Sequence, residues 1–252
     1  MSSSVPNPIF SILCFFILTI VFFIIRFFTR DSMKLVTFVV YLLLLIVGEF
    51  FINMKLTSAL CGTAQLGTAF FVTLVPWLII FGLLNVMLMV FKGWKQPFSN
   101  TFGYLITRIM GINGLLDQIL KSEADPSLGP AAKGLEYIYK DKSLFVNEIP
   151  LDDYDAFWKN MSANYFKPQA DEILKNKLKT MVFVKDLVSE FVWFSLTGCL
   201  VTTVAYNYLV NNKCSRSAQE LHAAHDAQQQ TSAANAAATA AAPAPRVYTI
   251  TE

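Results

Sequence analysis

Long hydrophobic runs and one polar block alternate along the chain. The first run, residues 9–28, is apolar except for Ser11, Thr19 and Arg26. A helix of about twenty residues extends about 30 Å, the thickness of a bilayer's hydrocarbon core. The pattern predicts an all-α integral membrane protein with about four transmembrane helices. The other predicted spans are residues 35–52, 66–91 and 187–210.

The second and third runs contain features that affect how they cross. The 35–52 run has 18 residues, which is near the lower limit for a spanning helix. If it failed to cross fully, the tail and the polar block would lie on the same side of the membrane. Pro76 removes a backbone donor and should kink the third helix. Trp77 beside it is expected in packing or at an interface.

The polar block, residues 92–186, is predicted to be a mostly helical extramembrane domain between the third and fourth spans. An apolar face at helical spacing predicts a helix that breaks near Gly111. This face lies either flat in the membrane interface or within a core of the block, and periodicity alone does not separate the two. Residues 144–149 have the composition of a short strand. The apolar face consists of Phe98, Phe102, Leu105, Ile109, Leu116 and Leu120.

The end of the block is predicted to continue into the fourth span as one long helix. An amphipathic helix around residues 151–165 comes first. Pro168 suits the first turn of the next helix. Apolar positions at 173–182 then recur at helical spacing, and no helix breaker precedes the span at 187–210.

The tail, residues 211–252, is a low-complexity segment rich in alanine. It lacks the large apolar residues that offset the entropy of folding. Residues 218–242 are expected to be transiently helical, because alanine is the best helix former. The last residues favour strands, and we expect them to dock on a partner as an edge strand. They are Val247, Tyr248, Thr249, Ile250 and Thr251.

Positive charges near the spans predict the orientation of the chain. Lys and Arg residues close to the membrane are more numerous on the side of the polar block than on the side of the termini. The positive-inside rule therefore places the block in the cytoplasm. Asn160, Met161 and Ser162 form a glycosylation triplet that would stay unmodified there.

Composition limits the partners and the role of cysteine. Only 15% of residues are charged, against about a quarter in soluble domains. A net charge of +2 is too small to predict nucleic acid as a partner. Cys61 and Cys214 are both expected near the membrane on the side of the termini, where they can form one disulfide if that side is oxidising. Cys14 and Cys199 lie in predicted spans and are expected to pack.

The candidate chemical residues favour structural roles. Asp152, Asp153 and Asp155 precede or open a helix, which favours capping over metal binding. His222 and His225 are the only histidines and lie in the tail. The rest of the chain therefore has no histidine base for the usual Ser-His-Asp or Cys-His reactions. We predict no catalytic, cofactor-binding or metal-binding residues and no cofactor.

Two acidic residues, Glu49 and Glu190, fall within or beside predicted spans. Acidic residues there are functional suspects. Their positions predict opposite depths in the membrane, so we do not expect them to pair. Solvation at the interfaces is the favoured interpretation, and a proton or ion relay is the alternative.

The sequence FKGWKQPFSNTFGY at residues 91–104 resembles membrane proteins of large icosahedral DNA viruses with an internal lipid layer, such as the chloroviruses. The resemblance implies a minor capsid protein in the virion's internal membrane or in a host endomembrane. We expect a homo- or hetero-oligomer whose partners are the lipid bilayer and other capsid or membrane proteins.

Three functions follow in decreasing order of expectation. The first is a non-enzymatic structural protein that ties the lipid layer to a surrounding protein shell. The second is a small ion channel or transporter with Glu49 or Glu190 in its pathway. The third is a membrane-bound enzyme that uses the aspartate cluster.

Overall fold

The protein is described by a computed structural model that covers residues 9–29, 31–122, 129, 132–211, 214 and 230–232. Residues Met1–Asn211 form one compact unit and Asn212–Glu252 a second. Regular structure among the described residues is helical, apart from one antiparallel bridge between Leu120 and Phe166. The predicted all-α class is confirmed.

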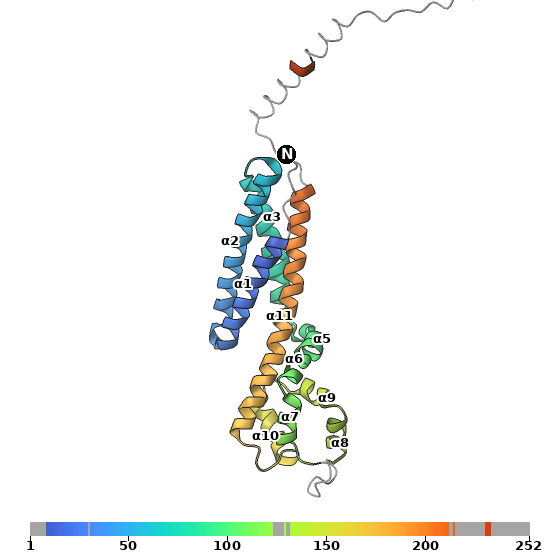
Figure 1. The fold of residues 1–252 in the computed structure, drawn as a ribbon. Coiled ribbons are helices and arrows are strands. Elements are labelled where there is room, and N and C mark those ends of the chain that lie inside the picture. Colours follow the sequence, from blue (N-terminus) through green and yellow to red (C-terminus); the bar gives the residue numbers. More distant parts are fainter. Residues whose placement is uncertain are drawn as a thin grey trace, which may run out of the picture. The chain divides into compact units, whose positions relative to one another are not determined.

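Four helical segments among the described residues are long and apolar enough to cross a membrane. In the first unit they run side by side, and the helices of the polar block gather around one half of α11 (Figure 1). We call the assembly of these four segments the bundle, and we count α11 as part of it only from Leu187 onward. Its segments are α1 (Ile9–Phe28), α2 (Lys34–Cys61), the run formed by α3 (Leu66–Val75), the π-helix η2 (Pro76–Gly82) and α4 (Leu83–Val90), and α11 (Glu172–Asn211).

Aromatic side chains fill the centre of the bundle. Phe15, Trp77, Phe81 and Phe194 are at most 4% exposed. Their rings lie 5.3 to 6.4 Å apart, centroid to centroid, where they meet, and such pairs add about 0.5–1.5 kcal/mol each beyond their buried area. The outward faces of the same helices are also apolar, as Phe71 at 66% exposure illustrates. An apolar outer face around an apolar core suits a lipid environment.

The second span is longer than predicted, because polar residues near its end are bonded to neighbouring helices. α2 continues past residue 52 to Cys61. Asn53 is buried and donates to Thr73 Oγ1 of α3 at 2.9 Å. Gly62 then adopts a left-handed conformation with φ of 76°, which terminates a helix at little steric cost.

Pro76 produces a π-helical segment within the third span. The helix continues through η2 into α4. A π segment accommodates the missing proline donor by a local change of hydrogen-bond register. Trp77 is fully buried, which resolves its two predicted roles in favour of packing.

The helices of the polar block surround the N-terminal half of α11. We call them, with α11 up to Asp186, the head. Its core contains Leu116, Leu135, Val146 and Leu178, each fully buried. The helical segments of the head before α11 are η3 (Lys92–Lys95), α5 (Gln96–Phe98), the π-helix η4 (Ser99–Gly103), α6 (Tyr104–Ile109), α7 (Ile112–Ile119), α8 (Ala132–Lys140), α9 (Lys142–Glu148) and α10 (Tyr154–Asn164). A separate short segment, η1 (Asp31–Met33), joins α1 to α2.

The predicted apolar face of the block divides at Gly111, where φ is 93°. The predicted break is confirmed. Beyond it, Leu116 and Leu120 are buried in the head, as the core interpretation requires. Before it, Leu105 and Ile109 are 52% and 75% exposed, as the interfacial interpretation requires.

Two local predictions are wrong. Residues 144–149 belong mostly to helix α9 instead of a strand, and Asp141 caps that helix by accepting from Ser143 N at 2.9 Å. Pro168 does not open the last helix, because α11 begins at Glu172. The prediction of one unbroken helix from the block into the fourth span is confirmed, since α11 has 40 residues.

Candidate functional site

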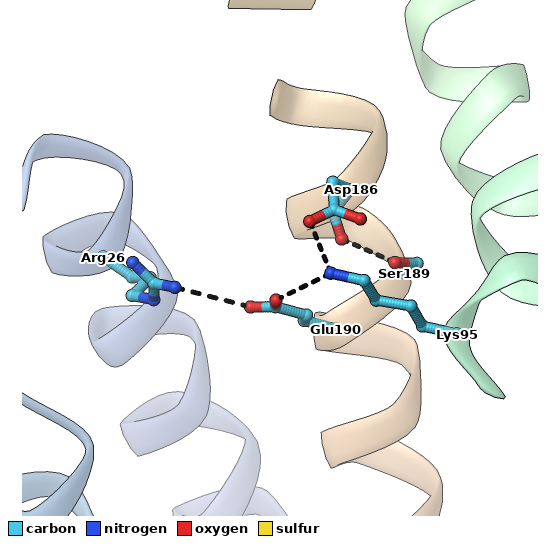
Figure 2. A network of polar contacts seen from close by, with 5 residues as sticks. All are labelled: Arg26, Lys95, Asp186, Ser189 and Glu190. Carbon is cyan, nitrogen blue, oxygen red and sulfur yellow. Dashed lines mark hydrogen bonds and ion pairs between the residues drawn. The ribbon is translucent and has the colours of Figure 1, made fainter. Parts of the chain in front are cut away.

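Four charged side chains from three segments meet where the bundle joins the head. Lys95 Nζ of η3 donates to Asp186 Oδ2 at 2.6 Å and to Glu190 Oε1 at 3.3 Å. Glu190 Oε2 also lies 3.9 Å from Arg26 Nη2. Figure 2 shows Glu190 between Arg26 of α1 and Lys95, with both acids on α11. We call these four residues the junction network.

Helix geometry explains how the sequence places these groups. Asp186 and Glu190 are four residues apart, so they lie on one face of α11. Arg26 is in the last turn of α1, where the helix dipole favours a cation. Lys95 follows the C-terminal end of α4 within a short 3₁₀ turn. The network therefore links the first span, the start of the head and the last span.

The network is largely shielded from solvent. The side chains of Arg26, Lys95, Asp186 and Glu190 are 11%, 18%, 24% and 22% exposed. Burial alone would lower the pKa of Lys95, but the charges of the two carboxylates and their hydrogen bonds raise it above its ordinary value. Lys95 is therefore protonated at neutral pH and holds both acids of α11.

A cavity of about 580 Å³ lies beside the network, within the range of about 300–1,000 Å³ found for ligand pockets. We call it the junction cavity. Part of its lining is apolar, including Phe22, Phe38, Leu88 and Phe194. The charged part contains Arg26, Lys34, Lys95 and Lys185 and the acids Asp152, Asp186 and Glu190.

Three polar side chains that line the cavity lack a hydrogen-bond or ion-pair partner of the kind that buried polar groups normally have. Asn85 is fully buried, and its Nδ2 donates to the carbonyl four residues earlier at 2.7 Å, but its Oδ1 accepts from no described residue. Arg26 Nη1 is buried and donates to no described residue. Lys185, 4% exposed, donates to the carbonyl oxygen of Val146 at 3.0 Å and forms no ion pair with any described residue.

Tryptophans mark the level of this site along the bundle. The rings of Trp94 and Trp193 lie 6.1 Å apart, and Phe98 lies 6.1 Å from Trp193. Trp94 adjoins Lys95 in the chain, and Trp193 follows Glu190 by three residues. Tryptophan is enriched where membranes meet water. This cluster supports a position at the membrane interface for the junction cavity.

Glu49 lies near the middle of α2, beside the N-terminal end of α1. It is 4% exposed, and its Oε2 accepts from Ser11 Oγ of α1 at 2.7 Å. The expectation of interfacial solvation is therefore wrong for Glu49, because α1 covers it. Glu190 is 22% exposed and forms ion pairs with Lys95 and Arg26. Ser11 and Arg26, the partners of the two acids on α1, are about 22 Å apart along the helix.

The acidic cluster behaves only partly as predicted: Asp155 lies in the first turn of α10, where the helix dipole favours an acid, but Asp153 does not cap the helix. Asp153 occupies the position before the helix, but its side chain makes no capping hydrogen bond. Asp155 instead approaches Lys175 Nζ at 3.0 Å and Lys179 Nζ at 3.6 Å. The hydrogen bond and charge of Lys175, aided by Lys179, lower the pKa of Asp155. In the part of the chain that the structure describes, no three His, Cys, Asp or Glu side chains are grouped to hold a metal ion.

The remaining predicted site residues stay predictions. His222, His225 and the docking segment 247–251 lie outside the described residues. A disulfide between Cys61 and Cys214 would link the two compact units and stays a prediction. Cys14 and Cys199 are half-buried free cysteines.

The junction network was not predicted from the sequence, although two signals point to it. Arg26 interrupts an otherwise apolar run, and an intramembrane or boundary charge generally has a partner. The spacing of Asp186 and Glu190 gives α11 an acidic face that calls for cations. Lys95 alone had no local signal, since its distance from α11 in the chain hides the contact. Comparison of the chain with protein-family models, curated proteins and solved structures found no match.

Proposed function

We propose that the protein is a non-enzymatic scaffold that holds a helical head at a fixed height on a membrane. One observation carries this proposal: α11 belongs to both cores. Leu178 and Val182 pack in the head, whereas Phe194 and Val201 pack in the bundle. A helix of 40 residues extends about 60 Å, roughly twice the hydrocarbon thickness.

The junction network supports the same function. Its ion pairs hold α11 to α1 and η3 at the point where α11 leaves the bundle. Charged groups that are shielded from water and held by several partners resist separation, because an unpaired member would be left in a poorly solvated site. The head is thereby held to the bundle by side chains as well as by backbone.

A channel or transporter is less well supported. Glu49 and Glu190 lie about 22 Å apart along the bundle, and the buried rings of Phe15, Phe22 and Phe81 lie between them. A conducting path needs polar groups or water along its length. The aromatic core supplies only scattered polar groups, such as the mutually bonded hydroxyls of Thr19 and Tyr41.

We further propose that the scaffold belongs to a virion membrane and ties the lipid layer to a surrounding protein shell. The resemblance of residues 91–104 to membrane proteins of large icosahedral DNA viruses supports this assignment. That stretch forms η3, α5 and η4 and supplies Lys95 to the junction network. The proposed partners are capsid or membrane proteins that bind the head or the tail.

Distance measurements between the head and the bundle test the scaffold. Spin labels carried by unnatural amino acids at Leu43 of α2 and Tyr137 of α8, both exposed, should give one narrow distance distribution in nanodiscs. Two glycines inserted after Asp186 should broaden it, whereas the same insertion after Gly129 should not. A distribution equally broad in the unmodified protein would contradict rigid coupling.

Particle composition tests the virion assignment separately. Tagged full-length chain should copurify with virus particles and remain with their membrane layer. Deletion of residues 215–252 should leave membrane insertion intact and reduce incorporation into particles. Detection in host membranes with none in purified particles would contradict the virion assignment, but not the scaffold.

A further inference from the structure

We infer that the junction cavity binds the phosphate headgroup of an anionic phospholipid, with an acyl chain in the adjoining groove between α1 and α11. This inference does not rest on the scaffold proposal. It follows from the charges, the unpartnered polar atoms and the apolar surface around one cavity.

The cationic side of the cavity has capacity for an anion. Glu190 is shared between Lys95 and Arg26, and its contact with Arg26 is the longer one at 3.9 Å. Arg26 Nη1 remains without a partner among the described residues. Lys185 has only neutral acceptors within hydrogen-bond distance. Burial lowers the pKa of Lys185, and the more distant carboxylates of Asp186 and Glu148 oppose this only in part. A phosphate would give these cations charged acceptors, and guanidinium groups match phosphate geometry well.

Asn85 requires that the ligand also supply a hydrogen-bond donor. Its side chain is fully buried at the cavity wall, and Oδ1 accepts from no described residue. An unpaired buried acceptor is costly. A hydroxyl on the headgroup would satisfy it, which favours a polyol headgroup such as phosphoglycerol over a choline headgroup.

The neighbouring groove accounts for the lipid tail. It has a volume of about 340 Å³ and an apolar lining that includes Ile20, Phe23 and Phe27 of α1 and Leu187 and Phe191 of α11. Leu187 lines both this groove and the junction cavity. A free phosphate ion has no apolar surface to bury in such a groove, whereas an acyl chain would bury apolar surface there.

The position of the cavity also suits a lipid. The ring cluster of Trp94, Phe98 and Trp193 lies at the level of the junction network. Headgroups occupy the zone in which interfacial tryptophans are found. A lipid bound here would place its phosphate against Arg26 and its chain along the outer face of α1.

Native mass spectrometry of the full-length protein in maltoside detergent tests the inference. Titration with dioleoyl phosphatidylglycerol should show affinity at least about tenfold higher than for dioleoyl phosphatidylcholine. Arg26→Gln should weaken phosphatidylglycerol binding about tenfold, since it removes a charge-assisted contact. Lys140→Gln removes the same charge from an exposed ion pair in α8 and should leave binding unchanged.

A groove variant separates lipid from free phosphate. Val188→Trp fills the groove lined by Val188 and should weaken phosphatidylglycerol binding without changing the response to inorganic phosphate. Inorganic phosphate that stabilises the protein as much as phosphatidylglycerol would overturn the lipid assignment. Equal affinity for the two lipids, or a folded Arg26→Gln variant that binds like the unmodified protein, would overturn the site itself.

If Arg26→Gln loses its helical circular dichroism, Lys34→Gln takes its place. Lys34 lines the same cavity and is half-buried, so the variant should fold. We expect it to weaken phosphatidylglycerol binding about threefold, because a partly solvated charge contributes less. Unchanged binding in a folded Lys34→Gln variant would likewise overturn the site.

Discussion

Gly103 packs directly against the backbone of Lys185, and a Cβ atom added to Gly103 would overlap the carbonyl oxygen of Lys185. The π-helix η4 approaches α11 this closely because glycine has no side chain. Gly103→Ala should therefore separate the two segments at the junction. We expect the free energy of unfolding to fall by about 1–3 kcal/mol, measured by thermal unfolding in detergent.

Gly114→Ala is the matched control. Gly114 lies within α7, and nothing lies within 4 Å of an added Cβ atom. The change should raise the free energy of unfolding by up to about 1 kcal/mol, since alanine is the better helix former. Equal Tm values for Gly103→Ala and the unmodified protein would show that the approach of η4 to α11 is looser than described.

A second close approach lies within the bundle. A Cβ atom at Gly198 of α11 would overlap the ring of Phe15 of α1. Gly198→Ala should cost about 1–3 kcal/mol of stability, and Phe15→Leu in the same chain should restore part of it by making room. Gly48→Ala, which meets nothing within 4 Å, serves as the control. Strictly additive effects of Gly198→Ala and Phe15→Leu would argue against their contact.

The junction network should show energetic coupling between its members. Lys95→Met and Glu190→Gln each leave a shielded charged partner less well paired, so each should destabilise the protein. A double-mutant cycle should give a coupling of about 1–2 kcal/mol, between exposed and fully buried pairs. The exposed pair Glu136 and Lys140 should give less than about 0.5 kcal/mol. Equal coupling for the two pairs would contradict the shielding of the network.

Asp155 should make the head's attachment to α11 sensitive to acid. Its pKa is lowered in the folded protein by Lys175 and Lys179, so its ion pairs stabilise the fold above the unfolded pKa of about 3.9. This contribution is lost as the pH falls through the lowered pKa. The Tm difference between the unmodified protein and Asp155→Asn should therefore shrink on acidification from about pH 7 to about pH 3. A constant difference would show that Asp155 acts through packing alone.

Orientation in the membrane is testable at Asn160. This residue is exposed on α10 in the head and belongs to a glycosylation triplet. If the head faces the cytoplasm, Asn160 stays unmodified when the chain is expressed in eukaryotic cells. Glycosidase treatment should then leave its electrophoretic mobility unchanged. A shift that disappears in Asn160→Gln would reverse the predicted topology.

The spans and the long last helix could be predicted because hydrophobic length and helical spacing are local properties. Residues 9–28 match α1. The end of α2 was placed too early, because Asn53 appears polar in the sequence but is bonded to Thr73. Residues 144–149 favour a strand by composition, yet the cap at Asp141 and packing of Val146 in the head make them helical.

The site was harder to predict than the fold, because its members are far apart in the chain. Lys95 and Glu190 are separated by 95 residues, and no periodicity connects them. Arg26, Lys95 and Lys185 are among the basic residues near the membrane on the side of the polar block, so in the sequence they predict only topology. In the folded chain, tertiary packing brings these three residues together to line one cavity. Helical spacing can predict that Asp186 and Glu190 share a face, but not which cations meet them.

The length of α11 has a mechanical consequence. Its residues 172–186 project from the bundle by about 22 Å at 1.5 Å per residue. A helix that must fit a bilayer of changed thickness responds by tilting. A tilt of about 10° would move the far end of this segment sideways by about 4 Å. A change in membrane thickness that tilts α11 would therefore displace the head laterally.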